Sequence, residues 1–397
     1  MDGIRRLAVK LRPAAEKMVK QGHPWVFSDS IRKVSPEGEA GDLAILFDQR
    51  TDQVFAIGLY DPHSPIRVKI IHQGGPLQIG PDFFKDKLSA AFAHRAPLLE
   101  TGTNAYRLLF GENDGFPGLI ADIYDRTGVM KIYSAAWFPY LELLAAQIIE
   151  VTGIKGVVLR LSRKLEERET AFQEGEILAG KPDLPEVVFN EYGVLFRADV
   201  LLGHKTGFFL DHRANRRKIG QYSAGKSVLD VFSYAGGFSV HALACGAEVV
   251  TSIDVSRQAL ELAKENAGMN PHTGRHRTIA GDAFELLRKM IGEGKKYDVV
   301  VIDPPSFAKR KKEVPTALKK YAELAELGAR LTRRGGLLML ASCSSRVGEA
   351  EFLKAHQEAF RRLDILLRQE AITRHDIDHP VRFPEGAYLK SVYYRLF

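Results

Sequence analysis

Residues 228–238 read VLDVFSYAGGF, an apolar run that leads into a loop with an acid near its start and two glycines near its end. Two further runs have the same plan, namely residues 249–254 (VVTSID) and residues 299–305 (VVVIDPP). Apolar runs that end in loops with acids, glycines or prolines are typical of parallel strands, which deliver those loops to one edge of a sheet. The sequence therefore predicts a doubly wound α/β domain with its functional loops at that edge.

The two glycines of the first loop, Gly236 and Gly237, argue against a dinucleotide. A dinucleotide fold uses G-x-G-x-x-G so that a pyrophosphate can approach backbone amides at a helix start, and the third glycine is missing here. A glycine pair after an acid instead suits an uncharged or positively charged ligand that lies against the backbone. We therefore expect Asp230, Phe232 and Ser233 to border a nucleoside with a positive centre.

Acids at the ends of the neighbouring strands complete the expected ligand site. Asp254 lies seventeen positions after Gly237, where a carboxylate can accept both ribose hydroxyls. Asp282 follows a third strand and is placed to accept from the exocyclic amine of an adenine, while Asp230 would lie near a sulfonium. These three acids together predict S-adenosylmethionine as the cofactor. The alternative is that they are ordinary loop acids that cap helices.

Composition sets broad limits on the chain. It has 397 residues, 45% of them hydrophobic and 26% charged, with a formal net charge of +7, and this predicts two or three globular domains. A mild excess of basic residues fits a nucleic-acid partner without proving one. No run approaches the roughly 18 apolar residues of a membrane span, and the two cysteines, Cys245 and Cys343, cannot build a disulfide scaffold or a zinc site. We expect no metal, no membrane partner and a cytoplasmic location.

Three segments differ in their patterns. Residues 1–75 contain short strand-like runs separated by turn residues, and they predict a small β-barrel. Residues 76–190 mix strand-like and helix-like runs and predict an α+β domain, whereas residues 191–397 alternate regularly and predict the α/β domain. The expected elements include strands at 7–11, 42–48, 54–60 and 66–71, and helices at 13–20, 82–100 and 256–269.

Over essentially its whole length the chain resembles the bacterial 23S ribosomal RNA large-subunit methyltransferases that make 5-methylcytosine, the RlmI-like family. The resemblance is carried by residues 22–27 (GHPWVF), 106–108 (YRL), 111–119 (GENDGFPGL), 203–213 (GHKTGFFLDHR), 303–305 (DPP) and 342–344 (SCS). It implies that residues 1–75 form a PUA domain, an RNA-binding β-barrel, and that 23S ribosomal RNA is the partner. It also implies that Lys205, Thr206, Phe209 and Asp211 lie near the cofactor. A homodimer is one of the assemblies that the sequence leaves open.

Cys343 is the candidate nucleophile. Carbon 5 of cytosine is a poor nucleophile, and a thiolate that adds to C6 makes C5 reactive enough to accept a methyl group. Cys343 follows the apolar run at residues 336–341 and should emerge at a strand end, where the nearby Arg346 could favour its thiolate. The competing interpretation is a buried, inert cysteine, and we assign that role to Cys245, which lies in a helical run beside alanines.

Asp303 is expected to be the second catalytic residue. The two prolines that follow it stiffen the loop and present the carboxylate to a flat base. The resemblance implies that Asp303 meets the cytosine edge near N3 and N4. Some related enzymes carry a second cysteine after the prolines, but this chain has Ser306 there. The base that removes the C5 proton is not identifiable from the sequence.

Basic clusters flank the expected site and favour contacts with RNA phosphates. They are Lys309-Arg310-Lys311-Lys312, Lys319-Lys320 and the group Arg213, Arg216, Arg217 and Lys218. Three alternatives remain: methylation of a guanine nitrogen in ribosomal RNA by the same fold without a covalent adduct, an RNA-binding protein with an inactive methyltransferase domain, and a NAD-dependent oxidoreductase. Cys343 argues against the first, the intact acids against the second and the missing third glycine against the third.

Overall fold

The structure is a computed structural model that describes residues 3–167, 171–363 and 365–397. The chain divides into two compact units, and each is built from several segments. The first unit holds Met1–Asn190, Ala198–Leu210 and Ile377–Gly386, and the second holds Glu191–Arg197, Asp211–Asp376 and Ala387–Phe397. The division into three domains at residues 75 and 190 stays a prediction.

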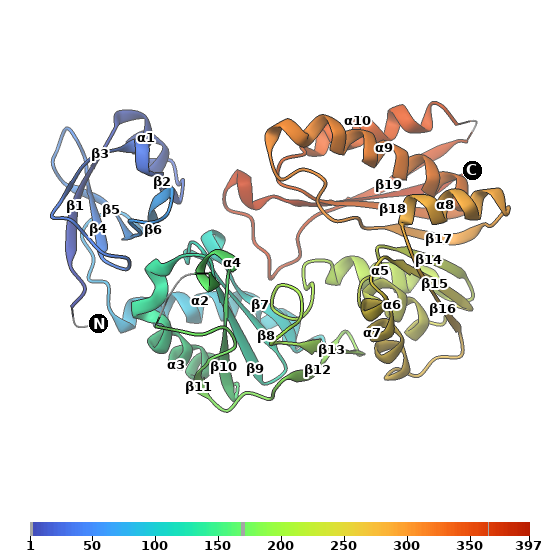
Figure 1. The fold of residues 1–397 in the computed structure, drawn as a ribbon, viewed down its shortest axis with the longest axis horizontal. Coiled ribbons are helices and arrows are strands. Elements are labelled where there is room, and N and C mark those ends of the chain that lie inside the picture. The colour runs from blue at the N-terminus through green and yellow to red at the C-terminus, as the bar shows by residue number, and fades with distance from the viewer. Residues whose placement is uncertain (1–2, 168–170, 364) are drawn as a thin grey trace. The chain divides into compact units, whose positions relative to one another are not determined.

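The first unit begins with a six-stranded sheet in the order β2-β6-β5-β4-β1-β3 (Figure 1). Its strands are β1 (Arg6–Leu11), β2 (Trp25–Phe27), β3 (Ile31–Ser35), β4 (Leu43–Phe47), β5 (Val54–Tyr60) and β6 (Ile66–Gln73), and α1 (Pro13–Lys20) follows β1. Side chains of β1 alternate between buried and exposed, which is the period of a half-buried strand. Leu7, Val9 and Leu11 thereby form part of the core of this sheet.

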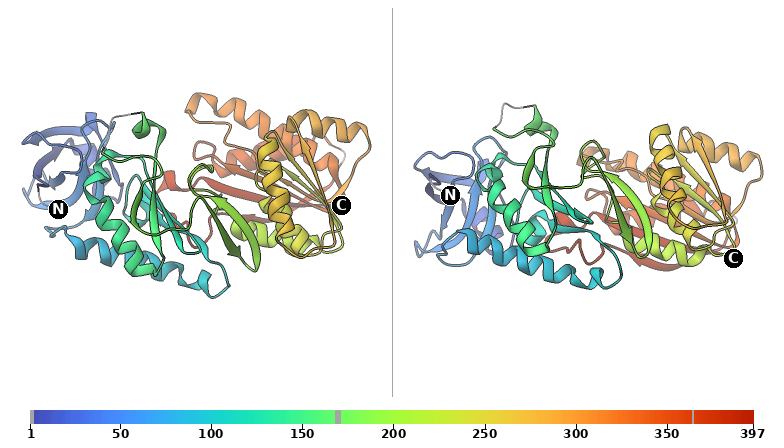
Figure 2. Two further views of the ribbon diagram at one scale, coloured as in Figure 1. Left: turned by 60° about the horizontal axis from the view of Figure 1, so that its bottom comes forward. Right: turned by 90° about the horizontal axis from the view of Figure 1, so that it is seen from below.

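A second sheet of the first unit has five strands in the order β11-β10-β9-β8-β7. Its elements are β7 (Ala105–Phe110), β8 (Leu119–Tyr124), β9 (Thr127–Ile132), β10 (Gly156–Leu161), β11 (Ile177–Gly180) and the helices α2 (Pro81–Leu99), α3 (Leu141–Thr152) and α4 (Arg163–Glu166). Helices α2 and α3 pack against each other and on this sheet (Figure 2). The mixed strand and helix pattern that the sequence predicts for this region is confirmed.

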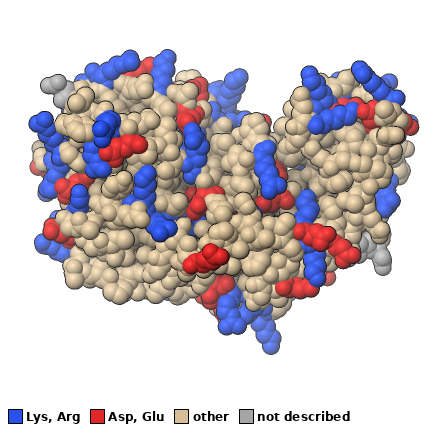
Figure 3. Space-filling model, turned by 180° about the vertical axis from the view of Figure 1, so that it is seen from behind, with Lys and Arg blue, Asp and Glu red and all other residues tan. Residues whose placement is uncertain are grey.

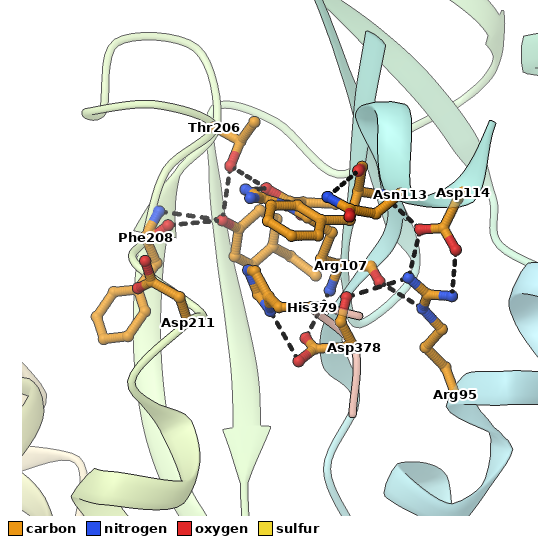
Figure 4. Close-up of polar contacts among 12 residues, drawn as sticks. Arg95, Arg107, Asn113, Asp114, Thr206, Phe208, Asp211, Asp378 and His379 are labelled. Atoms are coloured by element: carbon orange, nitrogen blue, oxygen red, sulfur yellow. Dashed lines mark hydrogen bonds and ion pairs between the residues drawn. The ribbon is translucent and has the colours of Figure 1, made fainter. Parts of the chain in front are cut away.

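A buried polar network ties Ile377–Gly386 to this second sheet (Figure 4). Arg95 donates to both carboxylate oxygens of Asp114, at 3.0 and 2.6 Å, and to the carbonyl of Asp378 at 3.1 Å. The Asp378 carboxylate accepts from the backbone N–H of Arg107 at 2.9 Å, and the Arg107 guanidinium forms two 2.8 Å hydrogen bonds with Asp122. The charges are therefore paired inside the unit, as buried charges must be.

The second unit is a seven-stranded sheet in the order β16-β15-β14-β17-β18-β20-β19. The strands are β14 (Ser227–Val231), β15 (Val249–Asp254), β16 (Arg275–Ala280), β17 (Tyr297–Ile302), β18 (Thr332–Cys343), β19 (Leu367–Thr373) and β20 (Leu389–Leu396). The first five run parallel, and β20 runs antiparallel to both of its neighbours. A separate two-stranded sheet consists of β12 (Glu186–Glu191) and β13 (Val194–Asp199).

Helices cover both faces of the seven-stranded sheet (Figures 1 and 2). The helices are α5 (Arg213–Ser223), α6 (Gly237–Ala244), α7 (Arg257–Gly268), α8 (Ala283–Gly292), α9 (Val314–Leu331) and α10 (Glu349–Phe360). On one face of the sheet α6 packs on both α5 and α7, and on the other face α9 packs on both α8 and α10. The central strands are buried on both sides, which explains their continuous apolar runs. The predicted doubly wound α/β architecture is confirmed.

Several local predictions also hold. Ser256 caps α7 by accepting a 3.2 Å hydrogen bond from the backbone N–H of Ala259, and the expected C-terminal strand is β20, paired with β19 as a hairpin. None of the helices in the described part of the chain combines the length and the apolar character needed to cross a bilayer.

Candidate active site

The candidate site lies in the second unit, where the carboxyl ends of the parallel strands meet at one edge of the sheet. The loop after β14 turns sharply: Phe232, Tyr234 and Gly236 have φ angles of 65°, 46° and 77°. Two of these are non-glycine residues in the left-handed region, a strained conformation that is common at functional sites. The stretch at residues 228–238, which predicts the fold, therefore contains a strained loop.

The glycine pair in this loop is required by packing inside the protein. A Cβ atom at Gly236 would lie 2.8 Å from Cβ of Ala263, and one at Gly237 would lie 2.8 Å from Cδ of Arg216. From the sequence we expect these glycines to leave room for a ligand against the backbone. Close approach of α7 and of the Arg216 side chain is the physical reason that the structure shows.

Asp230 is the most buried acid of the site. Its Oδ2 atom accepts from the backbone N–H and the hydroxyl of Ser239 at 3.0 and 2.7 Å. Burial, with a smaller contribution from the charges of Asp303 and Asp254, raises the pKa of Asp230 to about 7. Among the described residues, neither its Oδ1 nor the buried hydroxyl of Ser233 has a hydrogen-bond partner. These two unpartnered polar atoms, one near the end of β14 and one in the loop after it, fit the polar, positively charged end of S-adenosylmethionine.

Asp254 and Asp282 have local hydrogen bonds. Asp254 accepts at 2.9 Å from the backbone N–H of Tyr234 and from that of Ser256, so it joins the loops after β14 and β15. Asp282 is exposed and caps α8 by accepting from the N–H of Glu285 at 3.0 Å. These bonds leave further lone pairs on both carboxylates, and the assignments to ribose and adenine stay predictions.

Three side chains from distant parts of the second unit converge at the same edge. Cys343 is the last residue of β18, Asp303 follows β17, and His212 caps the start of α5. The Nε2 atom of His212 lies 3.3 Å from Oδ1 of Asp303 and 3.6 Å from Sγ of Cys343, and the thiol lies 3.8 Å from the same Asp303 oxygen. The structure therefore brings the two predicted catalytic residues together.

His212 is the member of this cluster that sequence reasoning missed. It is 3% exposed. Burial lowers its pKa, but the charge and hydrogen bond of Asp303 outweigh burial, so the pKa of His212 is raised overall. The only sequence signal was its place beside Asp211 in the GHKTGFFLDHR segment, where the resemblance drew attention to other residues.

Lys390 was also missed. It is buried on β20, and its ammonium donates to the carbonyl oxygens of Ser344, Val347 and Tyr388. Burial lowers the pKa of Lys390 to about 8, while the charge of Cys343 acts in the opposite direction. Arg346, which the sequence suggested as the cation near the thiol, is exposed. The buried cation beside Cys343 is therefore a residue from the C-terminal strand.

Such a group of histidine, carboxylate and thiol could in principle hold a metal ion, since its ligand atoms lie within 4.8 Å of one another. The ammonium of Lys390 interacts with the sulfur, and the imidazole of His212 lies in contact with the same thiol, which makes proton transfer possible within the protein. We therefore interpret the group by its proton chemistry.

The segment that precedes α5 is divided between the units. Lys205, Thr206 and Phe209 belong to the first unit and Asp211 to the second. The hydroxyl of Thr206 is buried and donates to Asp122 at 2.6 Å (Figure 4), while Asp211 accepts from the hydroxyl of Tyr388 at 2.8 Å. Thr206 thus has a structural hydrogen bond, and the cofactor role of these residues stays a prediction.

Two expectations about other residues were wrong. Arg213 and Arg216 are buried, and Arg216 forms hydrogen bonds of 2.7 and 2.6 Å with the buried carboxylate of Glu191. They cannot form an exposed phosphate contact, because a buried guanidinium needs its internal partner. Cys245 is exposed, at the C-terminal cap of α6, although the sequence assigned it to the core.

The other two basic clusters, Lys309–Lys312 and Lys319–Lys320, are exposed as expected. All four residues from Lys309 to Lys312 face solvent between Asp303 and α9. Glu313 holds the start of this segment by accepting from the backbone N–H groups of Lys309 and Arg310, at 2.8 and 3.1 Å. On the face shown in Figure 3, lysines and arginines are scattered among acids and form no continuous basic surface.

Comparisons with known proteins identify the family. A profile described as S-adenosylmethionine-dependent methyltransferase matches residues 155–378, and one described as a PUA-like domain matches residues 9–73. A Deinococcus radiodurans ribosomal RNA large subunit methyltransferase is 44% identical over 403 residues, covering 98% of each chain. Ribosomal RNA large subunit methyltransferase I of Aliivibrio fischeri is 34% identical, covering 97% of this chain and 98% of that one.

Solved structures show the same fold. A crystal structure of a protein assigned as a methyltransferase, in complex with S-adenosylhomocysteine, has a TM-score of 0.82 at 21% identity and covers 99% of this chain and 100% of its own. An assigned S-adenosylmethionine-dependent methyltransferase from Streptococcus mutans has a TM-score of 0.81 at 20% identity, covering 98% and 99%. The chain is an S-adenosylmethionine-dependent methyltransferase and belongs to the family of ribosomal RNA large subunit methyltransferase I.

Proposed function

We propose that this enzyme methylates carbon 5 of a cytosine in 23S ribosomal RNA through a covalent bond between Cys343 and C6 of the base. The substrate class rests on the names of the relatives, which act on large-subunit ribosomal RNA. The chemistry rests on one observation, the convergence of Cys343 and Asp303 at the strand ends, with the thiol 3.8 Å from the carboxylate. A thiol and a carboxylate side by side are the two groups that C5 methylation requires.

Each chain residue has a distinct task in this proposal. The Cys343 thiolate adds to C6, and the electron pair of the C5–C6 double bond moves toward C5 and the ring nitrogen N3. N3 takes a proton from solvent, and the Asp303 carboxylate stabilises this protonated nitrogen by accepting its hydrogen bond. When bound, S-adenosylmethionine supplies the methyl group that C5 accepts. A base then takes the C5 proton, and the electrons of that C–H bond re-form the C5–C6 double bond. The C6–S bond breaks with its electron pair on sulfur, so Cys343 leaves as a thiolate, and N3 gives up its proton. Ser306 takes the place of the second cysteine of related enzymes, so release depends on the stability of that thiolate.

The residues of the strained loop and its neighbours would hold the cofactor. Asp230 would face the sulfonium, since its Oδ1 atom is buried and without a partner among the described residues. Asp254 would accept the ribose hydroxyls and Asp282 the adenine amine. The glycines Gly236 and Gly237, with Phe232 and Ser233, would shape the wall of this site.

The RNA must present an unpaired or flipped cytosine, because the reacting atoms lie at a buried strand edge. The exposed segment from Lys309 to Lys312 follows Asp303 directly and would contact phosphates near the target base. The PUA-like region would add further contacts of the shape-reading kind.

Methylation of a guanine nitrogen is the alternative, and a covalent adduct separates the two. Nitrogen methylation needs no enzyme thiol, so Cys343 would then have no chemical task. Ribosomal RNA that contains 5-azacytidine should form a stable crosslink to Cys343 if the proposal is right.

The decisive experiment compares Cys343→Ala with the matched control Cys245→Ala. We expect the first variant to lose transfer of tritiated methyl groups to deproteinised ribosomal RNA while it still binds S-adenosylmethionine by calorimetry. The control should keep full transfer, since Cys245 is exposed at the end of α6. Retained transfer by Cys343→Ala would refute the cytosine C5 mechanism.

A further inference from the structure

His212 contacts both proposed catalytic groups, Cys343 and Asp303, which also lie close to each other. Its Nε2 atom lies 3.6 Å from the sulfur of Cys343 and 3.3 Å from Oδ1 of Asp303. A histidine in contact with a cysteine sulfur is the arrangement that activates thiols in other cysteine enzymes. The contact therefore raises the question of where the thiol proton goes.

The opposite side of the imidazole ring is held by an amide. Asn215 lies one turn along α5, and its Nδ2 atom is 3.1 Å from Nδ1 of His212. The other neighbours of this amide are hydroxyl groups: Thr373 at 2.6 Å and Tyr393 at 2.9 Å on its oxygen, and Ser391 at 3.2 Å on its nitrogen. Hydroxyl groups donate as well as accept, so the amide can be satisfied in either orientation.

Because the Asn215 amide can adopt either orientation, the imidazole of His212 has a hydrogen-bond partner in both of its protonation states. With Nδ2 toward the ring, Nδ1 accepts and the single proton of the neutral ring lies on Nε2. With the amide reversed, its oxygen accepts from Nδ1–H, and Nε2 is free to take a proton from sulfur. A ring that is packed edge-to-face on Phe238, with ring centroids 5.5 Å apart, can thus change charge without moving.

We propose that His212 takes the proton of the Cys343 thiol and holds the active site as a thiolate–imidazolium pair, in the cytosine C5 mechanism on which this inference rests. The S–H bond breaks, its electron pair stays on sulfur, and the proton forms a new bond to Nε2. The Asp303 carboxylate stabilises the imidazolium from the other side, in addition to its contact with the base.

The surrounding charges favour this pair on balance. Asp303 and Asp211 favour the charged ring and Arg216 opposes it, while burial also opposes it. On the sulfur side, Lys390 and Tyr321 both interact with Cys343, and the Asp303 carboxylate, 3.8 Å from the sulfur, opposes a negative charge there. A thiolate between two cations is the expected ground state of such a site.

The test measures the reactivity of one thiol. In a Cys245→Ser background Cys343 is the remaining cysteine of the chain, and its alkylation rate by iodoacetamide is followed from pH 5 to pH 10. We expect a midpoint below that of an ordinary thiol, which is about 8.5. His212→Gln keeps a donor but cannot hold the proton, and it should raise the midpoint by about 1–2 pH units.

A second variant moves the midpoint the other way. Asn215→Asp places a carboxylate beside Nδ1–H of His212. This charge stabilises the imidazolium and should therefore lower the midpoint of Cys343 alkylation. The site can accommodate the new carboxylate, because the three hydroxyl neighbours can all donate to it. His272→Gln is the control, because the Nδ1 atom of this histidine contacts the carbonyl of Gly274 at 3.0 Å, and the change should leave the midpoint unchanged. Opposite shifts from the two site variants cannot come from general loosening of the fold.

Failure of this inference is distinguishable from failure of the proposed function. If His212→Gln and Asn215→Asp both leave the alkylation midpoint where it was, His212 does not hold the thiol proton. If the midpoints shift but RNA that contains 5-azacytidine never crosslinks to Cys343, the ion pair exists and the cytosine C5 mechanism is wrong.

Discussion

Two buried charged clusters of this enzyme are built in opposite ways. In the first unit, Arg95 and Asp114 share hydrogen bonds of 3.0 and 2.6 Å, and the remaining donors of Arg95 meet backbone carbonyls. In the second unit, His212, Asp303 and Cys343 approach one another at 3.3–3.8 Å, and Asp303 and Cys343 are only half-buried.

The difference separates a structural cluster from a reactive one. Short, paired hydrogen bonds in the interior hold the side chains in one geometry and leave no donor or acceptor available to a substrate. Longer contacts at a strand edge leave lone pairs and a thiol that can still form new bonds. Burial and charge alone would not separate them, since both clusters hold buried ionisable groups.

The largest expected effect breaks the structural cluster. Asp114→Ala leaves the fully buried Arg95 without its carboxylate and should lower the free energy of unfolding by about 3–5 kcal/mol. Both tryptophans, Trp25 and Trp137, lie in the first unit, so tryptophan fluorescence during denaturation reports this unit. An unchanged fluorescence transition would show that Arg95 and Asp114 contribute little.

The next effect breaks the reactive cluster. Asp303→Asn should reduce methyl transfer about 10²–10³-fold, because the amide cannot hold a proton for the base. Because both tryptophans lie in the first unit and Asp303 lies in the second, stability is followed here by far-ultraviolet circular dichroism, and the unfolding transition should match that of the unaltered enzyme. A variant that loses stability and activity together would mean that Asp303 is a structural acid and that the comparison fails.

The smallest effect concerns Asp230, which combines deep burial with an unpartnered oxygen. Its pKa of about 7 lies above the usual value, so protonation is favoured in the folded enzyme and the acid loses its charge as the pH falls through 7. A positively charged cofactor should therefore bind more weakly below pH 7, by up to about tenfold per pH unit. Calorimetry at pH 6, 7 and 8 measures this dependence.

Asp230→Asn is the matched control, because its side-chain oxygen can still accept from Ser239. Its affinity for S-adenosylmethionine should be lower at pH 8 and nearly independent of pH. The same raised pKa makes ionised Asp230 unfavourable for folding, so its contribution to stability is present at low pH and is lost as the pH rises through 7.

The sequence predicted the strands and loops because parallel strands, buried on both faces, leave continuous apolar runs such as those of β14 and β17. It placed Asp303 and Cys343 at strand ends for the same reason. Their convergence follows from the strand order, in which β17 and β18 are neighbours.

The remaining site residues have no periodic signal. His212 and Lys390 gain their roles from partners that are distant in the chain, and a single histidine or lysine in a short segment carries no trace of such partners. Arg216 was misjudged for a related reason: it looks like part of a basic surface until Glu191, 25 positions earlier, is seen to pair with it inside the unit. A run of basic residues therefore predicts exposed side chains only where no buried acid elsewhere in the chain pairs with one of them.

The division of each unit among separate segments has a consequence for biosynthesis. Arg107 and Arg95 depend on Asp378, which lies 271 and 283 positions later in the chain. On the ribosome, a nascent first unit will hold these arginines without that partner until the segment that contains Asp378 has emerged. The interior of the amino-terminal portion therefore stays incomplete until that later segment has been made, and a product terminated before Asp378 would lack these hydrogen bonds.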